Sequence, residues 1–302
     1  MGAFAGPRDW GRLMTAMLTP FDSHGKINES EVKRIAEWLV DEQKNDGIVV
    51  AGTTGESPTL SALEKLRLLE LVLEAVGNRA AVVFGAGSYD TAESIELTKA
   101  GTERGAHGIM LVNPYYSRPG QTGLYAHFST VAQATTLPVM LYNIQPRSAI
   151  NLETPTLLRL AEIPNIVAVK EASGNIGQIS EVIAKAPEGF RVYSGDDALT
   201  LPIMALGGYG LVSVAAHVVG QELREIITRF ESSPTISRES HHRIAPFIQA
   251  IFSAPSPVPI KFALSQLGFA CNSVRLPLVE LDHTEGERIL RAMAAVRASA
   301  IV

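Results

Sequence analysis

The sequence is poor in the residue types that mark several classes of protein. Cys271 is the only cysteine among 302 residues, so no disulfide can form within the chain, which suits a reducing cytosol. The net charge of −5 and the lack of a basic tract argue against a nucleic-acid partner. The apolar runs have only strand length, and residues 1–12 hold no secretory signal. These absences predict a soluble, cytoplasmic protein.

Motifs for metals and nucleotide cofactors are also missing. There is no HExxH motif, no cysteine cluster and no Walker A lysine motif. His241 and His242 are adjacent, so they cannot share one helix face as a zinc pair would. Residues 85–87 (Gly-Ala-Gly) follow a predicted strand, but Asp90 stands at the third glycine position of a dinucleotide loop. The sequence therefore predicts no metal and no redox cofactor.

Two patterns alternate along most of the chain. Short apolar segments predict strands, and apolar residues three and four positions apart predict amphipathic helices. Ser61 followed by Glu64 marks one helix start through a capping box. Strands are predicted at residues 12–19, 47–51, 80–84, 108–112, 138–142, 191–194 and 210–214, and in the run that ends at Lys170. Helices are predicted from residue 61 and at residues 29–42, 91–104, 120–134, 154–162, 176–185, 198–206, 217–230, 237–252, 260–267 and 285–298.

Eight strands, most of them apolar throughout, indicate a parallel sheet that is covered on its outside. An open doubly wound sheet and a closed barrel both fit this pattern. The count of eight and the lack of a long linker before residue 215 favour the barrel. The predicted fold is an α/β (β/α)8 TIM barrel at residues 11–231 with a C-terminal helical segment at residues 232–302. Pro246 is expected to kink the helix at 237–252.

Lys170 is the residue on which the functional hypothesis depends. It ends an apolar strand, where a charge is costly. Desolvation would lower the pKa of its ammonium and supply a neutral amine, which attacks carbonyl groups. The alternative, from this run alone, is a lysine whose side chain extends to water at a strand end.

The C-terminal ends of barrel strands, with the loops that follow them, form one active-site mouth. The residues there combine an amine, hydroxyls that can carry protons, and a cation with donors for a carboxylate. They are Thr53, Thr54, Tyr115, Tyr116, Tyr142, Arg147, Lys170 and Gly195.

Most members of this set also have a purely structural interpretation. Residues 52–55 suit a tight turn before a capped helix, and the tyrosine pair suits a packed loop. Tyr142 could be a core tyrosine and Arg147 a surface arginine. Asp196 and Asp197 are interpreted as turn residues that cap the next helix.

Four motifs together resemble one known family. They are Gly-Thr-Thr-Gly-Glu-Ser at residues 52–57, Pro-Tyr-Tyr at 114–116, Tyr-Asn at 142–143 and Lys-Glu-Ala-Ser-Gly at 170–174. From about Gly11 to its C-terminus, the chain resembles the dihydrodipicolinate synthase / N-acetylneuraminate lyase family of pyruvate-dependent class I aldolases. It is most similar to the members that condense pyruvate with L-aspartate 4-semialdehyde on the diaminopimelate route to lysine.

The resemblance implies a mechanism without a cofactor. Lys170 would form a Schiff base with pyruvate, and the resulting enamine would attack the aldehyde of the semialdehyde. Tyr142, Thr54 and Tyr116 match a hydroxyl relay that moves protons. Tyr116 would enter the neighbouring subunit's site, within a homotetramer of tight dimers.

The resemblance also implies substrate contacts. Thr53 and Thr54, with their backbone donors, would hold the pyruvate carboxylate. Arg147 would pair with the carboxylate of the semialdehyde. Gly195 and Val212 match positions that line the pocket.

Around Arg147 the chain departs from the family pattern. Pro146 stands one residue nearer to the arginine than the family's proline does, which predicts an extended Gln145. Ala149 replaces a glycine, so a positive φ there would be costly. Both changes affect the direction in which the Arg147 guanidinium points, and therefore the binding of the second substrate.

A further departure concerns the site at which lysine inhibits some family members. Ser57, Glu93 and Tyr115 match residues of that site. Ala62 and Lys65 stand where inhibitable enterobacterial members have histidines, and a fixed cation opposes the binding of the ammonium of lysine. We therefore expect weak or absent inhibition by lysine.

Two alternatives to this function stay open. One is a related class I aldolase, such as N-acetylneuraminate lyase or a 2-keto-3-deoxy sugar acid aldolase, against which Arg147 argues. The other is a non-catalytic barrel retained for binding, against which the intact set of Lys170, Tyr142, Thr54 and Tyr116 argues.

Overall fold

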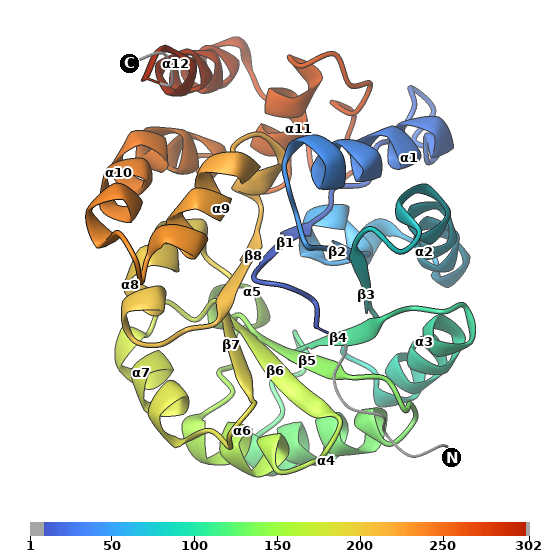
Figure 1. The fold of residues 1–302 in the computed structure, drawn as a ribbon. Helices are drawn as coiled ribbons and strands as arrows, with labels where there is room; N and C mark the ends of the chain where they lie inside the picture. Colours follow the sequence, from blue (N-terminus) through green and yellow to red (C-terminus); the bar gives the residue numbers. More distant parts are fainter. Residues whose placement is uncertain (1–8, 300–302) are drawn as a thin grey trace. The chain divides into compact units, whose positions relative to one another are not determined.

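The structure, a computed structural model, describes residues 9–299. Within them the strands follow one another in sequence order around a closed barrel (Figure 1). The predicted (β/α)8 barrel is therefore confirmed. The strands are β1 (Leu13–Ala16), β2 (Gly47–Val50), β3 (Ala81–Gly85), β4 (Gly108–Val112), β5 (Val139–Asn143), β6 (Ile166–Glu171), β7 (Arg191–Ser194) and β8 (Gly210–Ser213).

Helices separate the strands, as the periodicity predicts. The capping box is present: Ser61 Oγ accepts from the Glu64 N–H, and the Glu64 carboxylate accepts from the Ser61 N–H. The α-helices are α1 (Glu29–Glu37), α2 (Ala62–Val76), α3 (Thr91–Glu103), α4 (Gln121–Ala132), α5 (Gln145–Ser148), α6 (Thr154–Ala161), α7 (Ile176–Lys185), α8 (Thr200–Ala205), α9 (Gly220–Arg229), α10 (Pro234–Ile251), α11 (Val258–Ser265) and α12 (His283–Ser299). The shorter helical turns are η1 (Trp38–Glu42), η2 (Thr53–Gly55), η3 (Ser57–Thr59), η4 (Asp197–Leu199) and η5 (Ala215–His217).

The chain forms two compact units. Among the described residues, unit 1 contains 9–12 together with Ala81–Val212, and unit 2 contains Leu13–Ala80 together with 213–299. The predicted division between residues 231 and 232 stays a prediction. None of the helices within residues 9–299 is long and apolar enough to cross a membrane.

In unit 1, the strands from β3 to β8 pair in parallel with their sequence neighbours. Their apolar residues are buried on both faces: Leu141 of β5 and Val169 of β6 are both 0% exposed. Each such side chain stabilises the fold by roughly 1.5–3 kcal/mol. The register of β5 and β6 places Tyr142 opposite Lys170. Burial on both faces explains why these strands lack polar alternation.

In unit 2, β1 pairs with β2 in parallel, and α1 packs beside α2 (Figure 1). The helix predicted at residues 29–42 changes character at Trp38, where a π-helical turn begins. The buried Asn45 holds the end of this turn, because its side chain donates to the Leu39 carbonyl at 2.9 Å and accepts from Thr15 of β1 at 2.6 Å. Pro246 lies inside α10, and the expected kink stays a prediction.

Candidate active site

Lys170 lies at the C-terminal end of β6 and is only 4% exposed. Its Nζ lies 4.2 Å from the centroid of the Tyr142 ring on the neighbouring strand. Burial lowers the pKa of the Lys170 ammonium from 10.5 to about 8. The carboxylate of Asp197 opposes this shift of the pKa, and the guanidinium of Arg147 adds to it. Desolvation outweighs the attraction of Asp197, as the sequence predicts for an amine in an apolar strand.

The lowered pKa decides whether Lys170 can act as a nucleophile. An amine with a pKa of about 8 is about half neutral at pH 8, whereas one with a pKa of 10.5 is only about 0.3% neutral there. The difference is about 150-fold in the concentration of the reactive form. Lys170 therefore has the chemistry that attack on a carbonyl group requires.

Gly195 follows β7 and packs directly against the Lys170 side chain. Its N–H donates to the Glu171 carbonyl at 2.7 Å. A Cβ at this position would lie 2.9 Å from both Cγ and Cε of Lys170, closer than real carbon contacts come. The absence of a side chain at Gly195 therefore leaves the room that the lysine occupies. Val212 of β8 is fully buried, and its role in lining a substrate pocket stays a prediction.

The residues that follow Tyr142 and Lys170 join their two strands on the other face of the sheet. The Asn143 Nδ2 group donates to both carboxylate oxygens of Glu171, at 3.2 Å each. The Ser173 N–H donates to the same carboxylate at 2.9 Å. Burial raises the pKa of Glu171, against the effect of these hydrogen bonds. These hydrogen bonds connect the end of β5 to the end of β6 and so stabilise the register that places Tyr142 opposite Lys170.

The segment around Arg147 forms one helical turn, which the sequence analysis does not predict. The N–H of Ala149 donates to the Gln145 carbonyl at 2.9 Å, so Gln145 begins helix α5 and the prediction that it is extended is wrong. Pro146 fits there because the first turn of a helix needs no N–H donor at that position. Arg147 is exposed, and its guanidinium makes no hydrogen bond or ion pair with the other residues between 9 and 299.

Ala149 ends this turn with φ of 58°, which is the positive φ that would be costly at a position without glycine. A residue with a Cβ pays roughly 1–2 kcal/mol for this conformation, and glycine does not. We expect Ala149→Gly to raise the free energy of unfolding by about 1 kcal/mol, measured by urea denaturation. Ala126→Gly, at an exposed position inside α4, is the matched control and should lower it by about 1 kcal/mol. Destabilisation by Ala149→Gly would contradict this account of the turn.

Tyr116 is placed differently from the other residues of the predicted site. It is 93% exposed, so this chain does not bury it beside Lys170. Its φ of 70° is left-handed, a conformation that costs a tyrosine roughly 1–2 kcal/mol. Exposure is what entry into a neighbouring subunit would require, and that role stays a prediction.

Thr53 and Thr54 belong to unit 2, in the turn η2 after β2. Thr54 is buried and Thr53 is half-buried. The turn is held at Gly55, whose carbonyl accepts from Thr19 Oγ1 at 2.7 Å. Their contact with a carboxylate stays a prediction.

Asp197 is the site residue that the sequence analysis missed. The predicted capping role is confirmed for Asp196, whose Oδ1 accepts from the Ala198 N–H at 2.9 Å, and the same role of Asp197 stays a prediction. Asp197 is fully buried, and its charge acts on Lys170. The available signal was a second acidic residue after β7, at the same strand edge as the lysine.

The residues of the predicted lysine-inhibition site are distributed over both units. In unit 1, Ser88 Oγ donates to Glu93 at 2.5 Å and is also hydrogen-bonded to Tyr115. Burial raises the pKa of the Tyr115 hydroxyl. Ser57 lies in η3 of unit 2, where Lys65 is buried in α2. Their part in inhibition stays a prediction. No group of three His, Cys, Asp or Glu side chains among residues 9–299 is placed to hold a metal ion.

Comparison with known proteins gives the family. The sequence profile described as the Dihydrodipicolinate synthetase family matches residues 9–296. The chain belongs to the dihydrodipicolinate synthetase family. The predicted family is confirmed, and so is the prediction that the chain is an enzyme of the lyase type.

Individual members of the dihydrodipicolinate synthetase family are similar over almost the whole chain. The 4-hydroxy-tetrahydrodipicolinate synthase of Moorella thermoacetica is 50% identical over 94% of this chain and 97% of its own length. The crystal structure of a Bacillus anthracis dihydrodipicolinate synthase has a TM-score of 0.92 at 44% identity, covering 95% of this chain and 98% of that one. The lysine-bound enzyme of Cyanidioschyzon merolae has a TM-score of 0.93 at 41% identity, with the same coverage.

Proposed function

We propose that this dihydrodipicolinate synthetase family member condenses pyruvate with L-aspartate 4-semialdehyde, as a 4-hydroxy-tetrahydrodipicolinate synthase. The reaction belongs to the diaminopimelate route of lysine biosynthesis, and we place it in the cytoplasm. The observation that carries the proposal is the buried Lys170 amine, with a pKa of about 8 and its Nζ 4.2 Å from the Tyr142 ring. The 50% identity to the Moorella thermoacetica synthase supports the choice of substrates.

The proposed reaction begins with the neutral amine of Lys170. The amine attacks the ketone carbon of pyruvate, and loss of water leaves a protonated imine that draws electrons from the methyl group. Loss of a methyl proton gives the enamine, whose carbon forms a bond with the aldehyde carbon of the semialdehyde. The amine of the semialdehyde then attacks the imine carbon, closes the ring and releases Lys170. The lysine supplies the electron sink, so no cofactor is needed.

Other residues of the proposed site bind the substrates and move protons. Thr53 and Thr54 would hold the pyruvate carboxylate, and Arg147 would pair with the carboxylate of the semialdehyde. Tyr142, Thr54 and Tyr116 would carry protons, while Gly195 and Val212 would line the pocket. Tyr116 would come from a neighbouring subunit, in a homotetramer of tight dimers, because its own chain leaves it 93% exposed.

The proposed enzyme should respond weakly to lysine. The Cyanidioschyzon merolae relative has lysine bound, and Ser57, Glu93 and Tyr115 would form the corresponding site here. We expect little loss of activity at submillimolar lysine, because the Lys65 ammonium opposes a second ammonium. A steady-state assay with increasing lysine measures this, and Lys65→Ala should be the more sensitive protein. Strong submillimolar inhibition of the unmodified enzyme would refute the expectation.

A substrate comparison tests the proposed function. The enzyme is assayed with pyruvate and L-aspartate 4-semialdehyde, and separately for cleavage of N-acetylneuraminate and 2-keto-3-deoxy sugar acids. We expect turnover of the semialdehyde to exceed that of either sugar acid by orders of magnitude. Preference for a sugar acid would assign the chain to a different activity of the aldolase family.

A further inference from the structure

A buried ion pair lies next to the turn that carries Thr53 and Thr54. Glu56 directly follows this turn, and its side chain is 1% exposed. The Nζ of Lys261, a fully buried residue of α11, lies 2.5 Å from Glu56 Oε1. The other oxygen, Glu56 Oε2, accepts from the backbone N–H of Arg275 at 3.0 Å. Both carboxylate oxygens are therefore held by residues of the C-terminal segment, residues 232–302.

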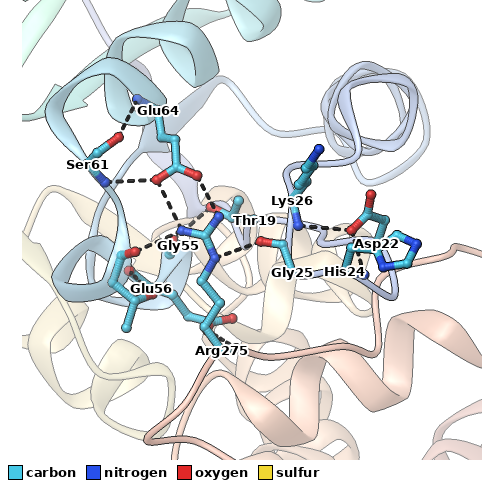
Figure 2. A network of polar contacts seen from close by, with 11 residues as sticks. Thr19, Asp22, His24, Gly25, Lys26, Gly55, Glu56, Ser61, Glu64 and Arg275 are labelled. Atoms are coloured by element: carbon cyan, nitrogen blue, oxygen red, sulfur yellow. Dashed lines mark hydrogen bonds and ion pairs between the residues drawn. The ribbon is translucent and has the colours of Figure 1, made fainter.

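Arg275 also holds the chain that follows Glu56. Figure 2 shows its guanidinium between the Gly25 carbonyl, which accepts at 2.9 Å, and the Glu64 carboxylate, which accepts at 2.5 and 3.1 Å. The guanidinium also donates to the Thr59 carbonyl at 2.8 Å. Its hydrogen bonds hold the pKa of Glu64 at about 2. The C-terminal segment thus fixes the loop from the threonine turn to the first turn of α2.

The backbone of Glu56 needs this support. Its φ of 57° and ψ of 35° are left-handed, a conformation that residues with a Cβ rarely adopt. In this conformation its N–H donates to the Thr53 carbonyl at 3.0 Å and closes the turn. A buried carboxylate and a buried ammonium are each costly alone, so Glu56 and Lys261 hold each other in place. The ion pair therefore sets the direction in which the turn presents Thr53 and Thr54.

We propose that Glu56 is a positioning residue for pyruvate, held in place by Lys261 and Arg275. The inference rests on the proposed function, in which the threonine turn binds the pyruvate carboxylate. Glu56 acts through the turn and touches no reacting atom. The C-terminal segment then controls the affinity for pyruvate without supplying a group to the chemistry.

Glu56→Gln tests the proposal, because it removes the charge and keeps the size of the side chain. The full-length variant is incubated with increasing pyruvate, and the imine on Lys170 is trapped with borohydride. We expect the half-saturating pyruvate concentration to rise about tenfold, because a small displacement of a binding group is enough for such a loss. The KM for the semialdehyde should change less than about twofold. Glu29→Gln, which breaks the exposed pair with Arg67 in the same unit, is the control and should change neither.

The double variant Glu56→Gln with Lys261→Met separates positioning from folding. It leaves no unpaired buried charge, so it should recover a Tm close to that of the unmodified protein even where Glu56→Gln alone unfolds. If Glu56 positions the threonine turn for pyruvate, the half-saturating pyruvate concentration stays raised in this stable double variant. Recovery of both the Tm and the pyruvate affinity would reduce Glu56 to a structural role and overturn the proposal.

The trapping results for the unmodified protein and for Glu56→Gln also distinguish failure of this inference from failure of the proposed function. If pyruvate gives no trapped adduct on the unmodified protein, the proposed function fails, and the positioning role fails with it. If the unmodified protein is trapped and Glu56→Gln needs no more pyruvate, only the positioning role fails.

Discussion

Replacing Lys170 with alanine is expected to abolish condensation, with a loss on the order of 10³-fold or more in kcat. The reason is that no other amine takes its place at the end of β6. Borohydride trapping with pyruvate should fail as well. Lys170→Arg should be equally inactive, because its guanidinium stays protonated at every working pH. Steady-state assays measure both variants, with circular dichroism to check that they fold.

Lys185→Ala is the matched control for this prediction. Lys185 is an exposed lysine of the same unit whose one ion pair among residues 9–299 is with Glu181 on the surface of α7, so its replacement should leave kcat unchanged. The pH profile gives a second check. The pKa of Lys170 is lowered to about 8, so the neutral amine accumulates as the pH rises through 8. The kcat/KM for pyruvate should therefore increase over this range. Activity of Lys170→Ala close to that of the control would remove Lys170 from the mechanism.

Replacing Arg147 with alanine is expected to damage the use of the second substrate. Its guanidinium is exposed, and its charge acts on Lys170, so it has the charge for a substrate carboxylate near the amine. We expect kcat/KM for the semialdehyde to fall by roughly 2–4 kcal/mol in transition-state stabilisation, or about 30-fold to 1,000-fold. The pyruvate concentration needed for trapping should change much less.

The control variants test the geometry of the proposed pair between the Arg147 guanidinium and the semialdehyde carboxylate. Arg147→Lys keeps the charge but loses the two-pronged donor, so it should recover only part of the lost activity. Arg118→Ala removes another exposed arginine of the same unit and should have little effect. An equal loss for both substrates with Arg147→Ala would mean that the arginine has a general effect on Lys170 and no specific role with the semialdehyde.

Patterns that are local in the sequence predicted the fold well. The strands at 108–112 and 191–194 and the helix at 176–185 have the predicted bounds, because apolar runs and helical spacing are properties of single segments. The burial of Lys170 was predictable for the same reason, since its own strand supplies the apolar surroundings.

Predictions from local sequence preferences failed where two preferences compete at the same position. The restriction that Pro146 places on Gln145 predicts extended backbone, but the preference of proline for the first turn of a helix won. Asp196 and Asp197 both suit a cap, and only the fold decides that Asp196 takes this role while Asp197 is buried.

Contacts between distant residues had no local signal. Glu56 and Lys261 are 205 positions apart, and nothing in either sequence neighbourhood predicts their pairing. The proposed role of the exposed Tyr116 would depend on a second chain, which this structure does not contain. Its role is therefore predicted from the family resemblance and not from the geometry of one subunit.

The most direct measurement is the identification of the residue that pyruvate modifies. The protein is incubated with pyruvate, reduced with borohydride, digested and examined by mass spectrometry. The expected result is one reduced adduct, on the peptide that contains Lys170, absent without pyruvate and absent from Lys170→Ala. An adduct on another lysine, or no adduct at all, would contradict the assignment of Lys170 as the nucleophile.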